Sequence, residues 1–205
     1  MIILTTNLSS LSSREDYQER LAPYKSQELS SQSLGARYLL SHLLEECGAS
    51  SHILKKDENN KPYLLGEPKL YVSLSHSYNS ALASISKNKI GVDIQKLKPC
   101  HKNIAKKYFS REEQEYIFVS QNQARDIILF WSFRESLFKL LDFSSAKFYS
   151  SSPMFSVVNE DLSLKQNITI SQGDNEESFW LYHNFIDDFV ITAVSKEEIA
   201  KILII

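Results

Sequence analysis

The chain has 205 residues and a hydrophobic content of 42%, which is enough to bury a core in one large domain or two small fused ones. Its 23 basic and 25 acidic residues nearly cancel, so the charge balance argues against nucleic acid as a partner. Two cysteines, Cys47 and Cys100, suit a reducing compartment, and the sequence shows neither a signal peptide nor the roughly 20 apolar residues that span a bilayer. We therefore expect a soluble cytoplasmic protein without a membrane partner.

The first half of the chain predicts a helix followed by short strands. Apolar residues recur with helical spacing over residues 34–44, and Gly48 is a typical signal for the end of that helix. Residues 57–94 hold short β-rich runs between polar turns. The most regular part, "ALASIS" and "IGVDI" around "KNK", predicts a β-hairpin.

The second half predicts two helices followed by strands. Ser110 opens "SREE", an S-x-x-E capping box, so a helix is predicted over residues 111–120. Residues 124–141 form the strongest helical stretch of the chain. The runs that follow have strand character: "MFSVV" (154–158), "LSLKQNITI" (162–170), "FWLYHNF" (179–185) and "FVITAVS" (189–195). This order predicts an α+β fold with two halves of similar build, residues 1–100 and 101–205.

The run "IGVDIQ", residues 90–95, places polar side chains in an apolar strand. Because side chains alternate along a strand, Gly91, Asp93 and Gln95 share one face and the apolar residues share the other. A glycine there would let a ligand approach the backbone. The alternative is an ordinary strand with its polar residues outward, and this hexapeptide alone favours that alternative.

Two further groups of residues suggest a site. On the long helix, Trp131, Glu135 and Lys139 follow at i, i+4 and i+8 and form one stripe. A solvated Glu–Lys pair is the alternative, although the aromatic surroundings argue against it. In "SLSHS", His76 lies beside Ser75 and offers hydrogen bonds to a polyanion, yet a strand-end histidine taken singly is more often structural.

Five short motifs in one order resemble a known family: "KPYL", "LSHS", "IGVDI", "IAKKYFSREE" and "FWSFRESLFKL". They look like the 4'-phosphopantetheinyl transferases, in particular the larger pseudo-dimeric (Sfp-type) class, and the 42 residues from Asp93 to Glu135 suit that pattern. The resemblance runs from about Leu34 to Lys139. It implies two similar halves related by a pseudo-twofold axis, each an antiparallel sheet packed with helices. The active cleft would lie between the halves of a monomer.

The resemblance also implies an activity. The family moves the phosphopantetheine arm of coenzyme A to a serine of an acyl or peptidyl carrier protein and releases adenosine 3',5'-bisphosphate. Its carriers serve fatty-acid, polyketide and nonribosomal-peptide synthesis. Such phosphoryl transfer needs a metal against the diphosphate and a group that takes the serine proton. Mg²⁺ is the expected metal because it prefers oxygen ligands and shares its shell with phosphates.

Residues that match the family's site carry its roles over as expectations. Asp93 and Glu135 match the metal ligands, and Glu135 is also the expected general base. Lys139 matches the lysine that contacts the diphosphate. The other expected coenzyme A contacts are Arg37 at the 3'-phosphate, Lys61 and Pro62 beside the nucleotide, and Ser75 and His76 at the phosphates.

Two positions depart from the family pattern. Many members have glutamate where this chain has Gln95, which keeps a carbonyl oxygen for the metal and removes one negative charge. We therefore expect a looser metal site with retained activity. Arg134 replaces a more usual lysine and keeps a positive charge that would attract phosphate.

The docking surface and two rival functions stay open at this point. A run of basic residues has two interpretations that the sequence favours equally: a docking patch for an acidic carrier protein, or an ordinary solvated surface. Its lysines are Lys96, Lys98, Lys102, Lys106 and Lys107. One rival is a coenzyme A or carrier-protein binding paralogue with lost metal, against which the intact Asp93, Glu135 and Lys139 argue. The other is an unrelated nucleotide-binding regulator, for which the five glycines supply no glycine-rich phosphate loop.

Overall fold

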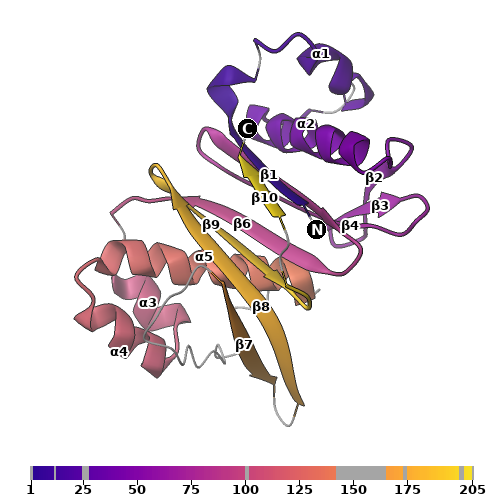
Figure 1. The fold of residues 1–205 in the computed structure, drawn as a ribbon. Coiled ribbons are helices and arrows are strands. Elements are labelled where there is room, and N and C mark those ends of the chain that lie inside the picture. The colour runs from indigo at the N-terminus through magenta and orange to yellow at the C-terminus, as the bar shows by residue number, and fades with distance from the viewer. Residues whose placement is uncertain are drawn as a thin grey trace.

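The computed structural model shows two four-stranded sheets and a two-stranded hairpin, with helices packed on the sheets (Figure 1). It describes residues 2–11, 13–24, 28–99, 102–141, 165–172, 175–198 and 201–204. The predicted α+β class is confirmed. Within these ranges, no helix has the length and apolar character needed to cross a membrane.

The first sheet joins the two ends of the chain. Its strand order is β10-β1-β5-β4. The strands are β1 (Ile2–Asn7), β4 (Tyr71–Ser77), β5 (Ser80–Ser86) and β10 (Lys201–Ile204). β10 adds one parallel pair, with β1, to pairings that are otherwise antiparallel.

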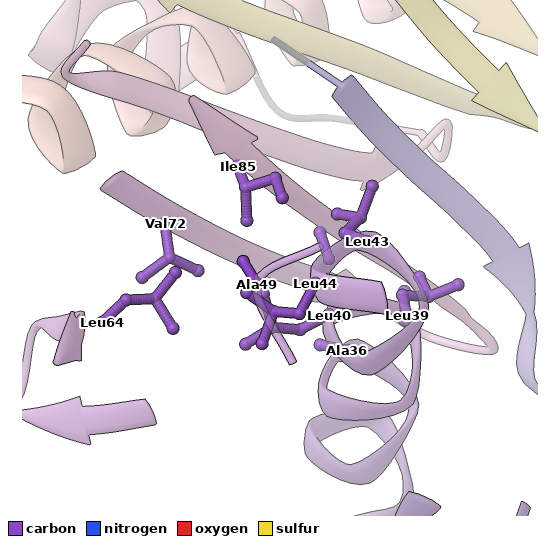
Figure 2. Packing of buried hydrophobic residues seen from close by; sticks show 11 residues of the cluster. Ala36, Leu39, Leu40, Leu43, Leu44, Ala49, Leu64, Val72 and Ile85 are labelled. Carbon is purple, nitrogen blue, oxygen red and sulfur yellow. The ribbon is translucent and has the colours of Figure 1, made fainter. Parts of the chain in front are cut away.

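Helix α2 (Ser31–Glu46) covers this sheet and supplies much of its core. The helix begins where Ser30 Oγ accepts a hydrogen bond from the backbone N–H of Ser33, and it ends just before Gly48, whose φ is +65°. The predicted helix is therefore confirmed. Figure 2 shows its apolar face against the sheet, with Ala36, Leu39, Leu40, Leu43 and Leu44 close to Val72 and Ile85. Short helices precede α2: η1 (Leu8–Ser10), α1 (Tyr17–Arg20) and η2 (Ala22–Tyr24).

The two-stranded hairpin consists of β2 (Ile53–Lys56) and β3 (Pro62–Leu65). Leu64 joins the core under α2. Asp57 closes the turn, because its N–H donates to the Lys61 carbonyl at 3.0 Å and its Oδ1 accepts from the Lys61 N–H at 2.8 Å. These bonds fix the backbone of Lys61 at the end of the hairpin.

The second sheet is antiparallel throughout, with the strand order β6-β9-β8-β7. Its strands are β6 (Ile90–Lys96), β7 (Lys165–Gln172), β8 (Asn175–Ile186) and β9 (Phe189–Ser195). These strands confirm three of the predicted strand runs, and the fourth, residues 154–158, lies outside the described residues. Helix α5 (Gln123–Leu141) packs on this sheet through Leu129, Phe133 and Leu137.

Two shorter helices, α3 (Lys102–Tyr108) and α4 (Arg111–Val119), pack on α5. The predicted capping box is confirmed: Ser110 Oγ accepts from the N–H of Glu113, and the Glu113 carboxylate accepts from the N–H of Ser110. Phe109 and Ile117 meet Phe130 of α5 in an aromatic-rich cluster. This cluster holds α5 through residues other than those that pack on the sheet.

The predicted hairpin between residues 81–86 and 90–94 is wrong. β5 pairs with β4 and β1, whereas β6 pairs with β9 in the other sheet. The hairpin lies one strand earlier, at β4 and β5, where Tyr78 turns the chain with φ +52°. A tyrosine in a left-handed turn leaves little trace in a sequence, because glycine or asparagine is the usual signal.

The two sheets meet edge to edge through serine side chains. Three hydroxyls of β4 accept hydrogen bonds from backbone N–H groups of β6: Ser73 from Val92, Ser75 from Ile94 and Ser77 from Lys96, at 3.0, 3.3 and 3.1 Å. Side chains therefore take the place of a backbone ladder at this junction. β6 precedes residue 100 but pairs with β9, which follows residue 100. The division at residue 100 and the pseudo-twofold relation stay predictions.

Candidate functional site

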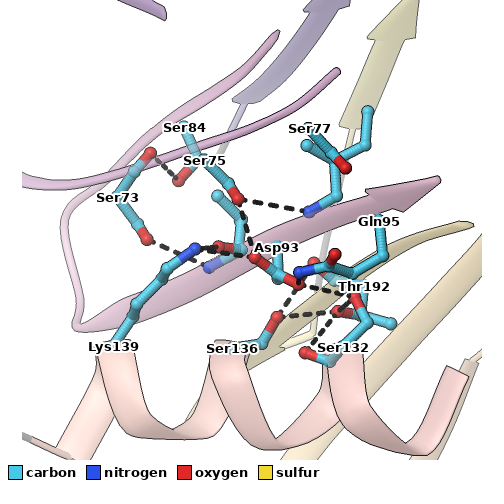
Figure 3. Close-up of polar contacts among 12 residues, drawn as sticks. Ser73, Ser75, Ser77, Ser84, Asp93, Gln95, Ser132, Ser136, Lys139 and Thr192 are labelled. Carbon is cyan, nitrogen blue, oxygen red and sulfur yellow. Dashed lines mark hydrogen bonds and ion pairs between the residues drawn. The ribbon is translucent and has the colours of Figure 1, made fainter. Parts of the chain in front are cut away.

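The centre of the candidate site is the carboxylate of Asp93 on β6, which is 2% exposed. Its Oδ1 accepts hydrogen bonds from Ser75 Oγ at 2.7 Å and Lys139 Nζ at 2.8 Å. Its Oδ2 accepts from Gln95 Nε2 at 2.9 Å and Ser132 Oγ at 3.0 Å (Figure 3). The structure thus brings together residues that the sequence singled out far apart in the chain, and it adds Ser132.

The strand geometry explains how Asp93 and Gln95 come to share a face. The expected alternation is confirmed, since Ile90, Val92 and Ile94 lie in the apolar cluster on the other face of β6. The interpretation of Gly91 needs correction. A Cβ at this position would lie 1.7 Å from the backbone oxygen of Ser136 on α5, so helix backbone and not a ligand fills the space beside Gly91.

Two serines one turn apart attach α5 to the sheet beneath Asp93. The hydroxyls of Ser132 and Ser136 contact Thr192 Oγ1 on β9 at 2.8 and 2.7 Å (Figure 3). Thr192 is the direct partner of Asp93 across the β6–β9 ladder. All three hydroxyl residues are fully buried. Sequence reasoning missed them, although two serines at i and i+4 within a bulky apolar helix were an available signal.

Lys139 links the helix to the strand. Besides the bond to Asp93, its Nζ donates to the carbonyl of Val92 at 2.9 Å, and its side chain is 25% exposed. The ammonium therefore compensates a carboxylate that is otherwise buried among neutral groups. Its predicted contact with a diphosphate stays a prediction.

Glu135 lies one turn before Lys139 on α5 and is half-buried. The three residues of the predicted stripe do not share one set of neighbours. Trp131 packs edge-on against Tyr108 of α3, with ring centres 5.5 Å apart, whereas Lys139 contacts Asp93. Over the described residues, His, Cys, Asp and Glu form no group of three or more that could hold a metal. A metal at this site would thus depend on two carboxylates and neutral oxygens.

A pocket with a volume of about 310 Å³ opens beside Lys139. Its lining carries four lysines, Lys61, Lys69, Lys89 and Lys139, against one carboxylate, Asp57. Burial lowers the pKa of Lys61, and the charge of Lys89 lowers it further while Asp57 opposes the shift. Pro62 and Tyr71 contribute to an apolar wall. A cationic pocket with an aromatic wall suits a phosphorylated ligand that carries a flat ring.

His76 and Arg37, both from the N-terminal half of the sequence, lie near Lys139 and Asp93. Partial desolvation lowers the pKa of His76, the charge of Lys139 lowers it further, and Asp93 acts in the opposite direction. Arg37 also contributes to lowering the pKa of His76, so its charge acts on the same region. The Arg37 guanidinium is largely buried and donates to the carbonyl and hydroxyl of Ser33 at 2.9 and 2.6 Å. Its role at a 3'-phosphate stays a prediction.

The structure places Arg134 in a buried ion pair on the side of α5 that faces α4, and its predicted phosphate contact stays a prediction. Arg134 is 3% exposed, its Nη2 donates to Glu113 Oε2 at 2.5 Å, and its guanidinium lies 4.4 Å from the ring centre of Phe109. Burial lowers the pKa of Arg134 and the charge of Glu113 raises it. Consecutive residues on a helix point about 100° apart, so Arg134 faces α4 while Glu135 faces elsewhere.

Replacing Glu113 with alanine is expected to lower the free energy of unfolding by about 3–5 kcal/mol, because Arg134 would lose its buried carboxylate partner. The capping bond to Ser110 would also be lost. Urea denaturation followed by circular dichroism measures the effect. Glu115→Ala is the control, since it removes an exposed carboxylate from the same helix and should leave stability unchanged within error. Equal losses in both variants would contradict the role of the buried pair.

Comparison with known proteins decides the family. The family model described as the 4'-phosphopantetheinyl transferase superfamily matches residues 89–194, just over half of the 205-residue chain. The chain belongs to this superfamily. The matched region begins immediately before β6 and ends within β9, so it includes Asp93, all of α5 and Thr192.

Curated relatives of this superfamily member are 4'-phosphopantetheinyl transferases of Bacillus. One from Bacillus pumilus is 27% identical over 107 residues, which are 50% of this chain and 46% of the relative. One from Bacillus subtilis is 33% identical over 84 residues, which are 40% of this chain and 38% of the relative. The Sfp enzyme of Bacillus subtilis strain 168 is 30% identical over the same shares. The chain thus spans less than half the length of the curated relatives it matches, and the similarity is to the Sfp type.

Asp93, Gln95 and Glu135 carry oxygen atoms of the kind that Mg²⁺ prefers as ligands. Asp93 supplies a buried carboxylate, and Gln95, with its amide nitrogen on Asp93, keeps its carbonyl oxygen available to a cation. Glu135 offers a second, half-buried carboxylate on α5. The Lys139 ammonium on Asp93 Oδ1 shows that this carboxylate already holds a cation.

Proposed function

We propose that this chain transfers the 4'-phosphopantetheine arm of coenzyme A to a serine hydroxyl of an acyl or peptidyl carrier protein, with release of adenosine 3',5'-bisphosphate. The observation that supports this most is the buried Asp93–Lys139 pair, which lies inside the region matched by the superfamily and borders a cationic pocket. Phosphoryl transfer needs carboxylates for a metal and cations for the phosphates, and both kinds of group meet here.

The pocket is the proposed site of the nucleotide end of coenzyme A. Lys61 and Lys139 both line it, and Lys139 also contacts Asp93, so a diphosphate would lie between the pocket and the carboxylate. Pro62 would pack beside the adenine ring. His76 and Arg37 add positive or hydrogen-bonding groups on the side of the first sheet.

The proposed reaction is a single displacement. The carrier serine oxygen forms a bond to the phosphorus that bears pantetheine, and the bond from that phosphorus to the leaving adenosine 3',5'-bisphosphate breaks. Glu135 takes the serine proton, and Lys139 stabilises the negative charge on the leaving bisphosphate. A bound Mg²⁺, held by Asp93, Glu135 and Gln95, would supply neutralisation of the diphosphate charge.

An acidic carrier protein is the proposed partner. The ammonium groups of Lys96 and Lys98 lie 5.1 and 5.6 Å from the ring centre of the exposed Tyr78, close to the junction. Lys96 also pairs with Asp188 at 3.0 Å, and a solvated surface is the competing explanation of this basic group. Because one chain supplies both sheets that meet at Asp93, we propose that a monomer is sufficient.

A mass measurement tests the proposed function. The purified chain is incubated with coenzyme A, Mg²⁺ and an apo acyl or peptidyl carrier protein, and each carrier should gain the mass of one phosphopantetheine. A carrier whose acceptor serine is replaced by alanine should gain none. Coenzyme A binding without mass gain on several carriers would overturn the enzyme and favour a binding paralogue. If the chain neither binds coenzyme A nor transfers the arm to any carrier, the proposal as a whole is overturned.

Replacing Ser132 with alanine is expected to lower kcat about tenfold with little change in the KM for coenzyme A, because Asp93 Oδ2 would lose a charge-assisted hydrogen bond. Ser136→Ala is the matched control. It also removes a buried hydroxyl from the Thr192 cluster, but that hydroxyl makes no described contact with Asp93. Steady-state kinetics of both variants decide the matter, and equal rates would show that Ser132 does not orient Asp93.

A further inference from the structure

All hydrogen-bond acceptor positions of Asp93 are occupied in the structure. A carboxylate offers about four lone-pair positions. Asp93 accepts four hydrogen bonds, from Ser75, Lys139, Ser132 and Gln95. A divalent cation can therefore reach this carboxylate only after one of the four donors has left it.

The donors differ in how firmly they are held. The hydroxyl of Ser75 also accepts from the N–H of Ile94, and that of Ser132 also contacts Thr192, so both belong to the rigid junction. Lys139 has a long side chain that is 25% exposed, and it carries a full positive charge. Two cations a few ångströms apart repel strongly in a partly buried site. Gln95, the fourth donor, is neutral, so Lys139 is the donor whose charge opposes a metal at Asp93.

The pocket gives Lys139 a second place to bind. Its side chain lines the pocket together with Lys61 and Lys89 while its ammonium contacts Asp93. A phosphate in the pocket would attract this ammonium through a charge-assisted hydrogen bond. The same side chain can thus pair with a protein carboxylate or with a ligand phosphate.

We propose that Lys139 is a built-in counter-cation. It occupies Asp93 in the coenzyme-free protein and moves to the phosphates of coenzyme A when these enter the pocket, so that a divalent metal binds tightly at Asp93 only with the coenzyme in place. The proposal rests on the proposed function for the identity of the phosphate ligand. By linkage, coenzyme and metal then raise each other's affinity by the same factor.

Binding of Mn²⁺ to the full chain without coenzyme, measured by electron paramagnetic resonance, tests this exchange. Lys139→Met and Lys139→Gln are each expected to bind Mn²⁺ about tenfold more tightly than the wild type, because the competing charge is gone. Lys69→Met removes an equal charge from the same pocket and should change the affinity less than about twofold, because Lys69 is exposed, makes no described contact with Asp93, and its charge is screened by solvent. Unchanged Mn²⁺ affinity in both Lys139 variants would overturn the proposal.

A second measurement uses the wild type and does not depend on the folding of any variant. The rate at which acetic anhydride modifies Lys139, read by peptide mass spectrometry, is expected to rise when Mn²⁺ saturates the site, since the displaced amine becomes accessible. A rate that does not change would overturn the exchange. Neither measurement uses coenzyme A or a carrier protein. The results therefore do not depend on whether the transfer assay succeeds.

Discussion

Alanine in place of Gly91 is expected to lower the free energy of unfolding by about 3 kcal/mol or more, at the upper end of the range for overpacked cores. The new Cβ would lie 1.7 Å from the backbone oxygen of Ser136 and 2.9 Å from the backbone nitrogen of Leu140. Backbone atoms of a packed helix cannot move aside as the end of a side chain can. The helix would have to leave β6, and urea denaturation should show the loss directly.

Gly48→Ala is the matched control for Gly91→Ala. A Cβ at Gly48 would meet no atom within 4 Å, but its φ of +65° is unfavourable for alanine. The expected cost is therefore conformational and about 1 kcal/mol. If Gly91→Ala were no more destabilising than Gly48→Ala, the close approach of α5 to β6 would be refuted.

Features that depend on neighbouring residues were predictable from the sequence. The capping box at Ser110 and the helix end at Gly48 are local signals, and both are confirmed. The alternation along β6 also follows from the strand geometry alone, which is why Asp93 and Gln95 were correctly placed on one face. The helical spacing singled out Lys139, and the family resemblance then gave it a role at the diphosphate; its contact with Asp93, across 46 residues of sequence, was not predicted.

Features that depend on partners distant in sequence were not predictable. The pairing of β6 with β9, and not with β5, is decided by which edges the folded sheets present, and the sequence near "KNK" does not contain that information. The same holds for Gly91. A side chain is excluded at this position because the backbone of α5 packs against it, and that contact is not encoded near Gly91 in the sequence. The ion pair of Arg134 was likewise not predicted, because its partner, Glu113, lies on another helix.

The position of Asp93 explains why short motifs, far apart in the sequence, supply the residues of the site. Asp93 lies where two sheets and α5 meet, so its four donors come from three elements: Ser75 from β4, Gln95 from β6, and Ser132 and Lys139 from α5. Each motif therefore supplies only one or two of the side chains that contact Asp93. The packing of those apolar residues supplies the alignment.

Replacing Glu135 with glutamine is expected to reduce the rate of phosphopantetheine transfer about a thousandfold, because the amide can neither accept the serine proton nor offer a negative charge to the metal. The side chain keeps its size, so the fold should remain. Single-turnover transfer, followed by the mass of the carrier protein, measures the rate, and thermal unfolding followed by circular dichroism confirms the fold. A wild-type rate in this variant would remove Glu135 from the mechanism.

Two comparisons separate the roles proposed for Glu135. Glu115→Gln makes the same chemical change at an exposed position of α4 and should leave the rate unchanged. Raising the Mg²⁺ concentration should restore much of the rate of Glu135→Gln if the carboxylate acts mainly as a metal ligand, since mass action refills a weakened site. It should restore little if the carboxylate acts mainly as the base, because no amount of metal replaces a missing proton acceptor.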